Sequence, residues 1–175
     1  MPLAPDVPLP WLIELVNEYA PQTRTAAGEE RDPYPNLSSH LDAPRIGTVT
    51  ERRLVELAER LWLVFGGAAQ SERVEQLNTL LRETALSPKL DDQGALGWTS
   101  RHRSQSALLL AGCTATLLDL IGTLGWQRLG TCASDTCQDV YADLTGRGSR
   151  RYCSHTCLNR TRVRAYRSRQ FRIDG

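Results

Sequence analysis

Four cysteines near the C-terminus constrain the fold of this 175-residue chain more than any other feature. They form two close pairs, Cys132/Cys137 and Cys153/Cys157, with four and three residues inside the pairs and fifteen residues between them. Zinc binds four thiolates in a tetrahedron, and two tight turns can each deliver one pair of ligands. Two disulfides, or four cysteines that merely pack, are the alternatives. Because spaced cysteine pairs in a chain without export features are usually metal ligands, we predict one structural Zn²⁺ bound by all four thiolates.

The residues around the cysteines predict the order of a treble-clef zinc module. Val140 and Tyr141 are strand-forming residues, and residues 145–149 are rich in turn formers, so the interval between the pairs is expected to form a hairpin. The second pair is expected to open a helix, with Cys157 in its first turn. Four thiolates leave zinc no open coordination position, and the chain has no phosphate loop, dinucleotide glycine pattern or HExxH motif. We therefore expect no enzyme.

Charge is distributed unevenly along the chain, although the formal net charge is only +1. Residues 128–175 contain ten arginines and four aspartates, a net charge of +6, and the remaining residues carry −5. Residues 144–172 contain nine arginines and no acidic residue. An acidic body with a basic end indicates a polyanionic partner, and nucleic acid is the leading candidate.

The arginines after the second cysteine pair lie on several sides of the expected helix. Arg160, Arg164 and Arg167 share one face, and Arg162 and Arg169 point the opposite way. A helix charged on several sides cannot be buried against its own domain, so its faces meet solvent or phosphate. The alternative is a solvated surface or a disordered tail. The predicted DNA contacts are Arg147, Arg150, Arg151, Arg160, Arg162, Arg164, Arg167 and Arg169.

The region before the cysteines is predicted to be an all-α bundle with one small hairpin. Apolar residues repeat at helical intervals, and Thr48 and Glu51 have the spacing of a capping box. Four prolines among charged and small residues indicate an irregular segment at residues 21–47, where His40 is expected to be a solvated loop histidine. The expected elements are helices over 11–19, 48–66, 71–86 and 103–126 and a hairpin over 88–99.

The most apolar run, residues 106–124, contains Asp119 and reads as a buried core helix rather than a membrane span. Cys113 within it is expected to be a small buried hydrophobe. The four tryptophans are expected to be core aromatics; the alternative is that they line a ligand pocket. Since the N-terminus lacks the pattern of a signal peptide, we expect a reducing cytoplasm.

Residues 128–172 resemble the CGNR zinc finger, which is found at the C-terminus of bacterial proteins with an N-terminal ABATE domain. The family has a first cysteine pair, a hairpin with an aromatic residue, an Arg-Arg-aromatic-Cys approach and a Cys-Gly-Asn-Arg signature that opens a basic helix. Leu158 stands where the family has glycine. The matching residues here are Cys132, Cys137, Tyr141, Arg150, Arg151, Tyr152, Cys153, Cys157, Asn159 and Arg160.

The helical residues 11–126 look like the ABATE domain, including Leu15, Val16 and Asn17 in the first helix and the Leu77 and Asn78 element. The family is regarded as bacterial stress-responsive transcription regulators, so the resemblance implies DNA binding at the nucleoid. We divide the chain into a helical domain, 1–127, and a zinc finger, 128–175. The helical domain is expected to form a homodimer or to bind an unknown small-molecule ligand.

Two other functions fit the same residues. The finger can be a protein-interaction module that docks on polymerase, a sigma factor or another regulator. It can also be a redox sensor, in which oxidation of the four thiolates ejects zinc and unfolds the module.

Overall fold

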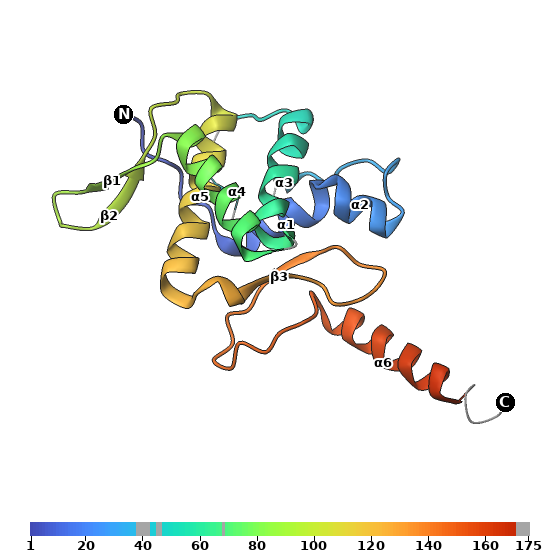
Figure 1. Ribbon diagram of the computed structural model, residues 1–175. Helices are drawn as coiled ribbons and strands as arrows, with labels where there is room; N and C mark the ends of the chain where they lie inside the picture. Colours follow the sequence, from blue (N-terminus) through green and yellow to red (C-terminus); the bar gives the residue numbers. More distant parts are fainter. Residues whose placement is uncertain (38–42, 45–46, 68, 171–175) are drawn as a thin grey trace.

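The structure is a computed structural model that describes residues 1–37, 43–44, 47–67 and 69–170, with the backbone alone at residues 168–169. The described part is mainly helical, with two small hairpins and a C-terminal four-cysteine module, which confirms the predicted fold class. Figure 1 shows the arrangement. The elements are α1 (Leu9–Tyr19), α2 (Pro21–Ala27), α3 (Glu51–Gly66), α4 (Gln70–Thr84), β1 (Ser87–Leu90), β2 (Leu96–Thr99), α5 (Gln105–Leu124), η2 (Trp126–Arg128), β3 (Leu129–Thr131), β4 (Val140–Ala142) and α6 (His155–Gln170).

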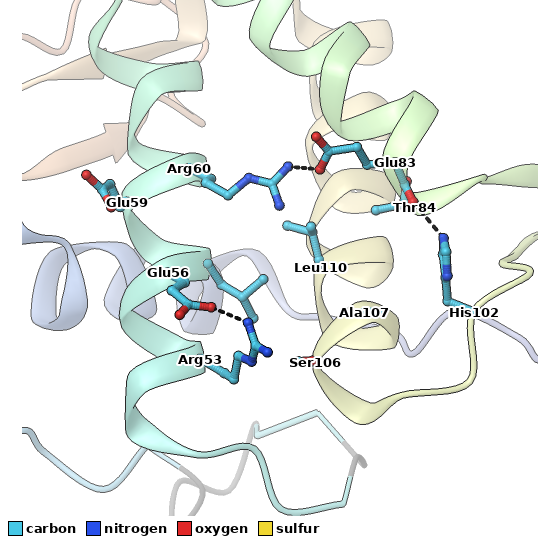
Figure 2. A pocket seen from close by; sticks show the side chains of 11 residues that line it. Arg53, Glu56, Glu59, Arg60, Glu83, Thr84, His102, Ser106, Ala107 and Leu110 are labelled. Carbon is cyan, nitrogen blue, oxygen red and sulfur yellow. Dashed lines mark hydrogen bonds and ion pairs between the residues drawn. The ribbon is translucent and has the colours of Figure 1, made fainter.

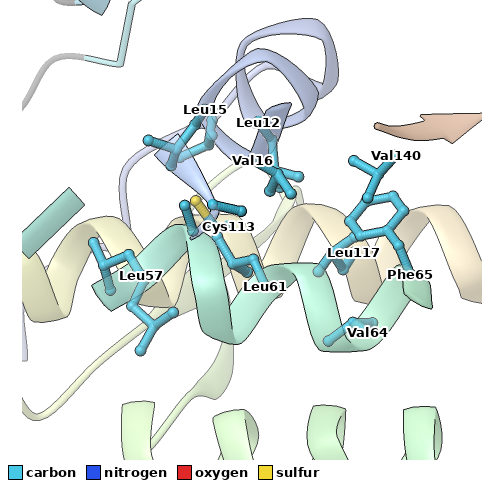
Figure 3. Close-up of a cluster of buried hydrophobic side chains, with 14 of the residues drawn as sticks. Leu12, Leu15, Val16, Leu57, Leu61, Val64, Phe65, Cys113, Leu117 and Val140 are labelled. Atoms are coloured by element: carbon cyan, nitrogen blue, oxygen red, sulfur yellow. The ribbon is translucent and has the colours of Figure 1, made fainter. Parts of the chain in front are cut away.

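The core lies between α1, α3, α4 and α5. Leu12, Leu61 and Leu117 are fully buried there, and Figure 3 shows them meeting from three different helices. Cys113 is also fully buried, as predicted for a small hydrophobe. The helix α5 has the length and apolar composition of a membrane span, but it contributes Leu109, Leu117 and other buried residues to this core. Burial against the other helices therefore explains its apolar sequence.

The hairpin predicted between the two cysteine pairs was wrong, because β4 pairs with β3, which precedes the first pair, and residues 143–154 form no strand. The antiparallel hairpin β3–β4 belongs to the same core although it lies next to the cysteines. It contacts α1 and α3. Leu129, Val140 and Ala142 are buried and join the cluster formed by the helices, and Figure 3 shows Val140 beside Phe65. The hairpin therefore connects the helical region to the cysteine module, and the division of the chain at residue 127 stays a prediction.

The prediction of an irregular segment at residues 21–47 was wrong at its start. Pro21 does not merely end the first helix but occupies the first position of α2, where its missing N–H costs no hydrogen bond. Gly28 ends α2 in the left-handed conformation, with φ 78°. His40 lies outside the described residues.

Two helix boundaries and one tryptophan also differ from the predictions. The helix α3 begins at Glu51 after Thr50 and has no side-chain cap, so Thr48 and Glu51 form no capping box. The helix α5 ends at Leu124, because the chain turns at Gly125, with φ 87°. Trp98 lies in the antiparallel hairpin β1–β2, which confirms the hairpin predicted at 88–99 but places this tryptophan outside the core cluster.

Candidate metal centre and basic helix

The fold brings the four predicted cysteines together. The Sγ atoms of Cys137 and Cys153 are 3.7 Å apart, those of Cys153 and Cys157 are 3.5 Å apart, and all four lie within 4.8 Å of one another. A disulfide requires a sulfur–sulfur distance of about 2.05 Å, and all four thiols are free. A tetrahedron with zinc–sulfur bonds of about 2.3 Å separates its sulfurs by about 3.8 Å. The donor set and its spacing therefore fit one tetrahedral metal ion such as Zn²⁺.

Backbone hydrogen bonds hold the first cysteine pair in a tight turn. The N–H of Cys137 donates to the C=O of Ser134 at 3.1 Å, and the N–H of Cys132 donates to the C=O of Asp139 at 2.8 Å. The N–H of Ala133 donates to the C=O of Arg151 at 2.7 Å, which ties this turn to the approach of the second pair. These backbone bonds hold the two segments that carry the cysteine pairs next to each other and so fix the positions of the sulfurs.

The second pair is held by the start of α6. The Oγ of Ser154 accepts a hydrogen bond from the N–H of Cys157 at 3.2 Å, as an N-cap residue does. The N-terminus of α6 therefore lies beside the sulfurs, and its partial positive charge favours thiolate. Thr161 donates to the C=O of Cys157 at 3.0 Å one turn later. Cys157 lies in the first turn of the helix, as the sequence predicted.

Two thiols of the cluster hold their protons more tightly than an ordinary cysteine does. Burial raises the pKa of Cys137 to about 12 and also raises the pKa of Cys153. Burial acts in the same direction on Cys157, but hydrogen bonds from the neighbouring thiols and Ser154 lower its pKa overall. Four adjacent thiolates cannot form together without a cation, so metal binding must displace protons.

Asp143 organises the loop between the hairpin and the second pair. Its buried carboxylate accepts hydrogen bonds from the N–H and Oγ of Thr145, at 2.9 and 2.6 Å, and from the N–H of Arg150 at 2.8 Å. The bond from the Thr145 side chain, followed by the bond from the Arg150 backbone, lowers the pKa of Asp143 to about 2. The sequence analysis missed this residue. The sequence pattern that could have identified it is an aspartate two residues before a threonine at the start of a turn.

Arg150 is exposed, but its guanidinium is engaged with the backbone of the finger. Its guanidinium donates to the carbonyls of Ala142 at 3.3 Å, Tyr152 at 2.9 Å and Cys153, and it lies 5.4 Å from the ring centre of Tyr141. These contacts span the hairpin and the second cysteine pair. Arg150 therefore joins the hairpin to the second cysteine pair, a role that the sequence alone did not suggest.

All arginines of the predicted set for which the structure describes a side chain are exposed, Arg150 included. Figure 1 shows α6 extending away from the rest of the molecule, and Arg160, Arg162 and Arg167 are exposed along it. Arg164 forms an exposed ion pair with Asp135 at 3.2 Å. The side chain of Arg169 lies outside the described residues. Arg147 and Arg151 are exposed on the loop before α6.

Two side chains of the helical region hold the finger in place. The amide of Asn17 forms two hydrogen bonds with the backbone of Val140, at 3.2 and 2.7 Å. The indole N–H of Trp62 donates to the C=O of Gln138 at 2.9 Å. Asn17 thus reaches the first residue of β4, and Trp62 reaches the segment just before it. The sequence analysis found neither contact, because both partners lie far apart in the sequence.

Arg73 makes a third connection, from α4. Its Nε donates to the C=O of Val64 at 2.7 Å, and a terminal nitrogen donates to the C=O of Leu129 at 3.1 Å. The guanidinium also lies 5.5 Å from the ring centre of Trp126. Arg73 therefore joins two helices to the first strand of the finger.

The helical region contains a cavity of about 430 Å³ between α3, α4 and α5, which Figure 2 shows. Its floor is apolar, with Leu57 and Leu110. Ion pairs close its rim, because Arg53 contacts Glu56 at 2.5 Å and Arg60 contacts Glu83. A second cavity, of about 520 Å³, is lined by aromatic residues, which are Trp11, Tyr19 and Tyr34. Trp11 is thus both a core residue and a pocket residue.

Comparison with known proteins identifies the C-terminal module. A search of curated proteins finds no match. The sequence model of the CGNR zinc finger matches residues 128–170, which include the four cysteines, the hairpin β3–β4 and α6. Residues 1–127 lie outside this match, so the resemblance to the ABATE domain stays a prediction. Residues 128–170 are a CGNR zinc finger domain whose four cysteines form a cluster suited to one metal ion.

Proposed function

We propose that this protein is a DNA-binding transcription regulator. Its finger binds one structural Zn²⁺ through Cys132, Cys137, Cys153 and Cys157 and presents α6 to double-stranded DNA. The observation that carries the proposal is that α6 extends from the body with exposed arginines within a segment, residues 144–172, that contains no acidic residue. Clustered arginine matches the phosphate backbone in charge and in hydrogen-bonding geometry.

The metal ion has a structural role in this proposal. When bound, it supplies four bonds that join the first cysteine turn to the start of α6. The chain's own residues then set the direction of the helix, because Ser154 caps it and Arg150 bonds to the carbonyl of Cys153. We propose no catalytic activity for this centre.

The proposed phosphate contacts are the predicted arginines other than Arg150. We leave Arg150 out of this set, because its donors are engaged with backbone carbonyls inside the finger. Arg164 can exchange its exposed partner Asp135 for a phosphate at little cost, since exposed ion pairs are weak. The set is Arg147, Arg151, Arg160, Arg162, Arg164, Arg167 and Arg169.

The salt dependence of binding tests the proposal. With about five phosphate contacts, the affinity of zinc-loaded protein for a labelled random duplex should fall by about 10²- to 10³-fold between 50 and 200 mM salt. The double variant Arg160→Ala/Arg167→Ala should bind more weakly and should flatten this slope. Arg52→Ala, which removes an equally exposed arginine from α3, is the control and should bind as the parent does. A wild-type affinity that does not change across this salt range would contradict the proposal.

For the helical region we propose dimerisation or the binding of a small-molecule signal. The cavity between α3, α4 and α5 supports the second role, because it combines an apolar floor with charged groups at its rim. The protein would act at the nucleoid in a reducing cytoplasm, where the thiols stay available to the metal.

A further inference from the structure

We infer that α6 is a recognition helix that reads base edges in the major groove of DNA. This inference rests on the proposed function and goes beyond it, because contacts to phosphate alone carry no sequence information. It assigns the reading of bases to a stripe of uncharged residues, Asn159, Val163, Tyr166 and Gln170. It assigns the arginines on either side of the stripe to the two phosphate strands that border the groove.

The four residues of the stripe share one face of α6. Their spacing of four, three and four residues keeps them on one side of a helix with 3.6 residues per turn. All four are exposed, and Val163 and Tyr166 expose 49% and 63% of their surface. The amide of Gln170 donates to the hydroxyl of Tyr166 at 3.0 Å, so the last two members of the stripe contact one another. Exposed apolar and amide groups on a basic helix are unexplained by phosphate binding.

Arginines flank this stripe on both sides. Arg160 and Arg167 lie about a quarter turn to one side, where they line one shallow groove together with Asn159 and Val163. Arg162 lies to the other side of the stripe and is also exposed. Positive charge on both sides of an uncharged stripe matches the groove of a duplex, in which the base edges lie between two phosphate strands.

The metal cluster determines which face of α6 looks outward. Cys157 is buried among the other sulfurs, and Thr161 and Ala165 follow it on the same side of the helix with intermediate exposure. The hydroxyl of Thr161 is occupied by the carbonyl of Cys157. This anchored face is opposite to the stripe. The cluster therefore prevents the helix from rotating and turns the stripe away from the body.

The dimensions and chemistry of α6 suit a major groove. A helix of 16 residues is about 24 Å long, and with side chains it is about 10–12 Å wide, which fits a groove about 12 Å wide. Asparagine and glutamine side chains form paired hydrogen bonds with adenine, and apolar groups contact the methyl group of thymine. We therefore expect Asn159 and Val163 to select A·T base pairs near the anchored end of the helix.

Selection from a pool of randomised duplexes tests the inference on full-length, zinc-loaded protein. The wild type should enrich one short motif of about three to five base pairs. Asn159→Ala/Val163→Ala should lose or change that motif, with discrimination reduced about 5- to 150-fold per lost contact, and should keep its affinity for random duplex within about twofold. The flank variant Arg160→Ala/Arg167→Ala should lose affinity for every sequence and should retain the motif. Zinc content and helicity matching the wild type would establish that each variant is folded.

The possible failures are distinguishable. If the wild type binds duplex DNA but enriches no motif, or if Asn159→Ala/Val163→Ala enriches the wild-type motif unchanged, the inference is wrong and the proposed function stands. If the wild type binds no duplex at all at low salt, both the inference and the proposed function are wrong. In that case, capture of a protein partner that depends on Val163 and Tyr166 would identify the face as a protein-docking surface.

Discussion

The side-chain amide of Asn17 on α1 pairs with the backbone of Val140 on β4 as a neighbouring strand would. Its Nδ2 donates to the C=O at 3.2 Å, and its Oδ1 accepts from the N–H at 2.7 Å. Val140 is 1% exposed, so water cannot replace these bonds without moving the hairpin. We predict that Asn17→Ala lowers the free energy of unfolding by about 1–3 kcal/mol, because two buried backbone groups lose their partner. Urea unfolding followed by circular dichroism measures this change.

Asn78→Ala is the matched control for Asn17→Ala. Asn78 is an exposed residue of α4, so its replacement should change the free energy of unfolding by less than about 0.5 kcal/mol. Equal effects of the two substitutions would show that the pairing with Val140 contributes nothing specific.

Arg73 is predicted to stabilise the contact between α4 and the finger. Its half-buried guanidinium donates to the carbonyls of Val64 and Leu129, and Arg73→Ala leaves both acceptors without this partner. We expect a loss of about 2–3 kcal/mol in thermal or urea unfolding, since hydrogen bonds to charged groups are the stronger ones. Arg82→Ala, an exposed substitution on the same helix, should cost less than about 1 kcal/mol. A loss of similar size in both variants would contradict this role.

The metal content of serine variants should distinguish the four clustered cysteines from Cys113. Replacing Cys132, Cys137, Cys153 or Cys157 with serine should reduce the bound zinc from one ion per chain, because a tetrahedral site loses one of its four thiolates. Cys113→Ser changes a fully buried residue in α5 and should keep one ion per chain wherever the variant folds. Elemental analysis after gel filtration measures this. A full complement of zinc in Cys153→Ser would refute the four-thiolate centre.

Removal of the metal should release α6 and leave the hairpin β3–β4 in place. Leu129, Val140 and Ala142 lie in the core with the helices, whereas α6 is joined to the body chiefly through the cysteine cluster. After chelation, hydrogen–deuterium exchange should become fast in α6 and should change little in α5 and β4. Re-addition of Zn²⁺ should restore protection. Equally fast exchange in the hairpin would mean that the entire finger depends on the metal.

Asp143 is predicted to make stability depend on pH in the acid range. Its pKa falls from 3.8 to about 2 on folding, so the unfolded chain binds the proton more readily. The carboxylate therefore contributes stability that is complete above about pH 5 and is lost as the pH falls towards 2. Relative to Asp143→Asn, the wild type should be more stable at neutral pH, and this difference should shrink between about pH 4 and pH 2. Denaturant unfolding with a chelator present at every pH gives both proteins the same metal-free reference, and a difference independent of pH would contradict the prediction.

The sequence predicted the elements whose signals are local. The spacing of the cysteines required two turns that face each other, and the structure brings all four sulfurs within 4.8 Å. The helix after the second pair and the hairpin at 88–99 followed from residue patterns over short windows. The start of α2 was missed because a proline after a helix can either be followed by irregular chain or begin a new helix. Packing against the rest of the molecule decides between these two outcomes.

The sequence by itself determined the four-cysteine module and the basic helix, since a metal site and a helix depend on residues close together in the chain. Only the tertiary structure decided how this module is held and which arginine is engaged with the module's own backbone. Asn17 and Val140 are 123 residues apart, and no local pattern reports such a contact. Arg150 and Arg160 are both exposed arginines of one basic segment, yet Arg150 donates to three backbone carbonyls of the finger and Arg160 lines the groove along α6. The positive charge of the segment follows from its composition alone. The partners of each arginine side chain depend on the hydrogen bonds that the folded chain supplies.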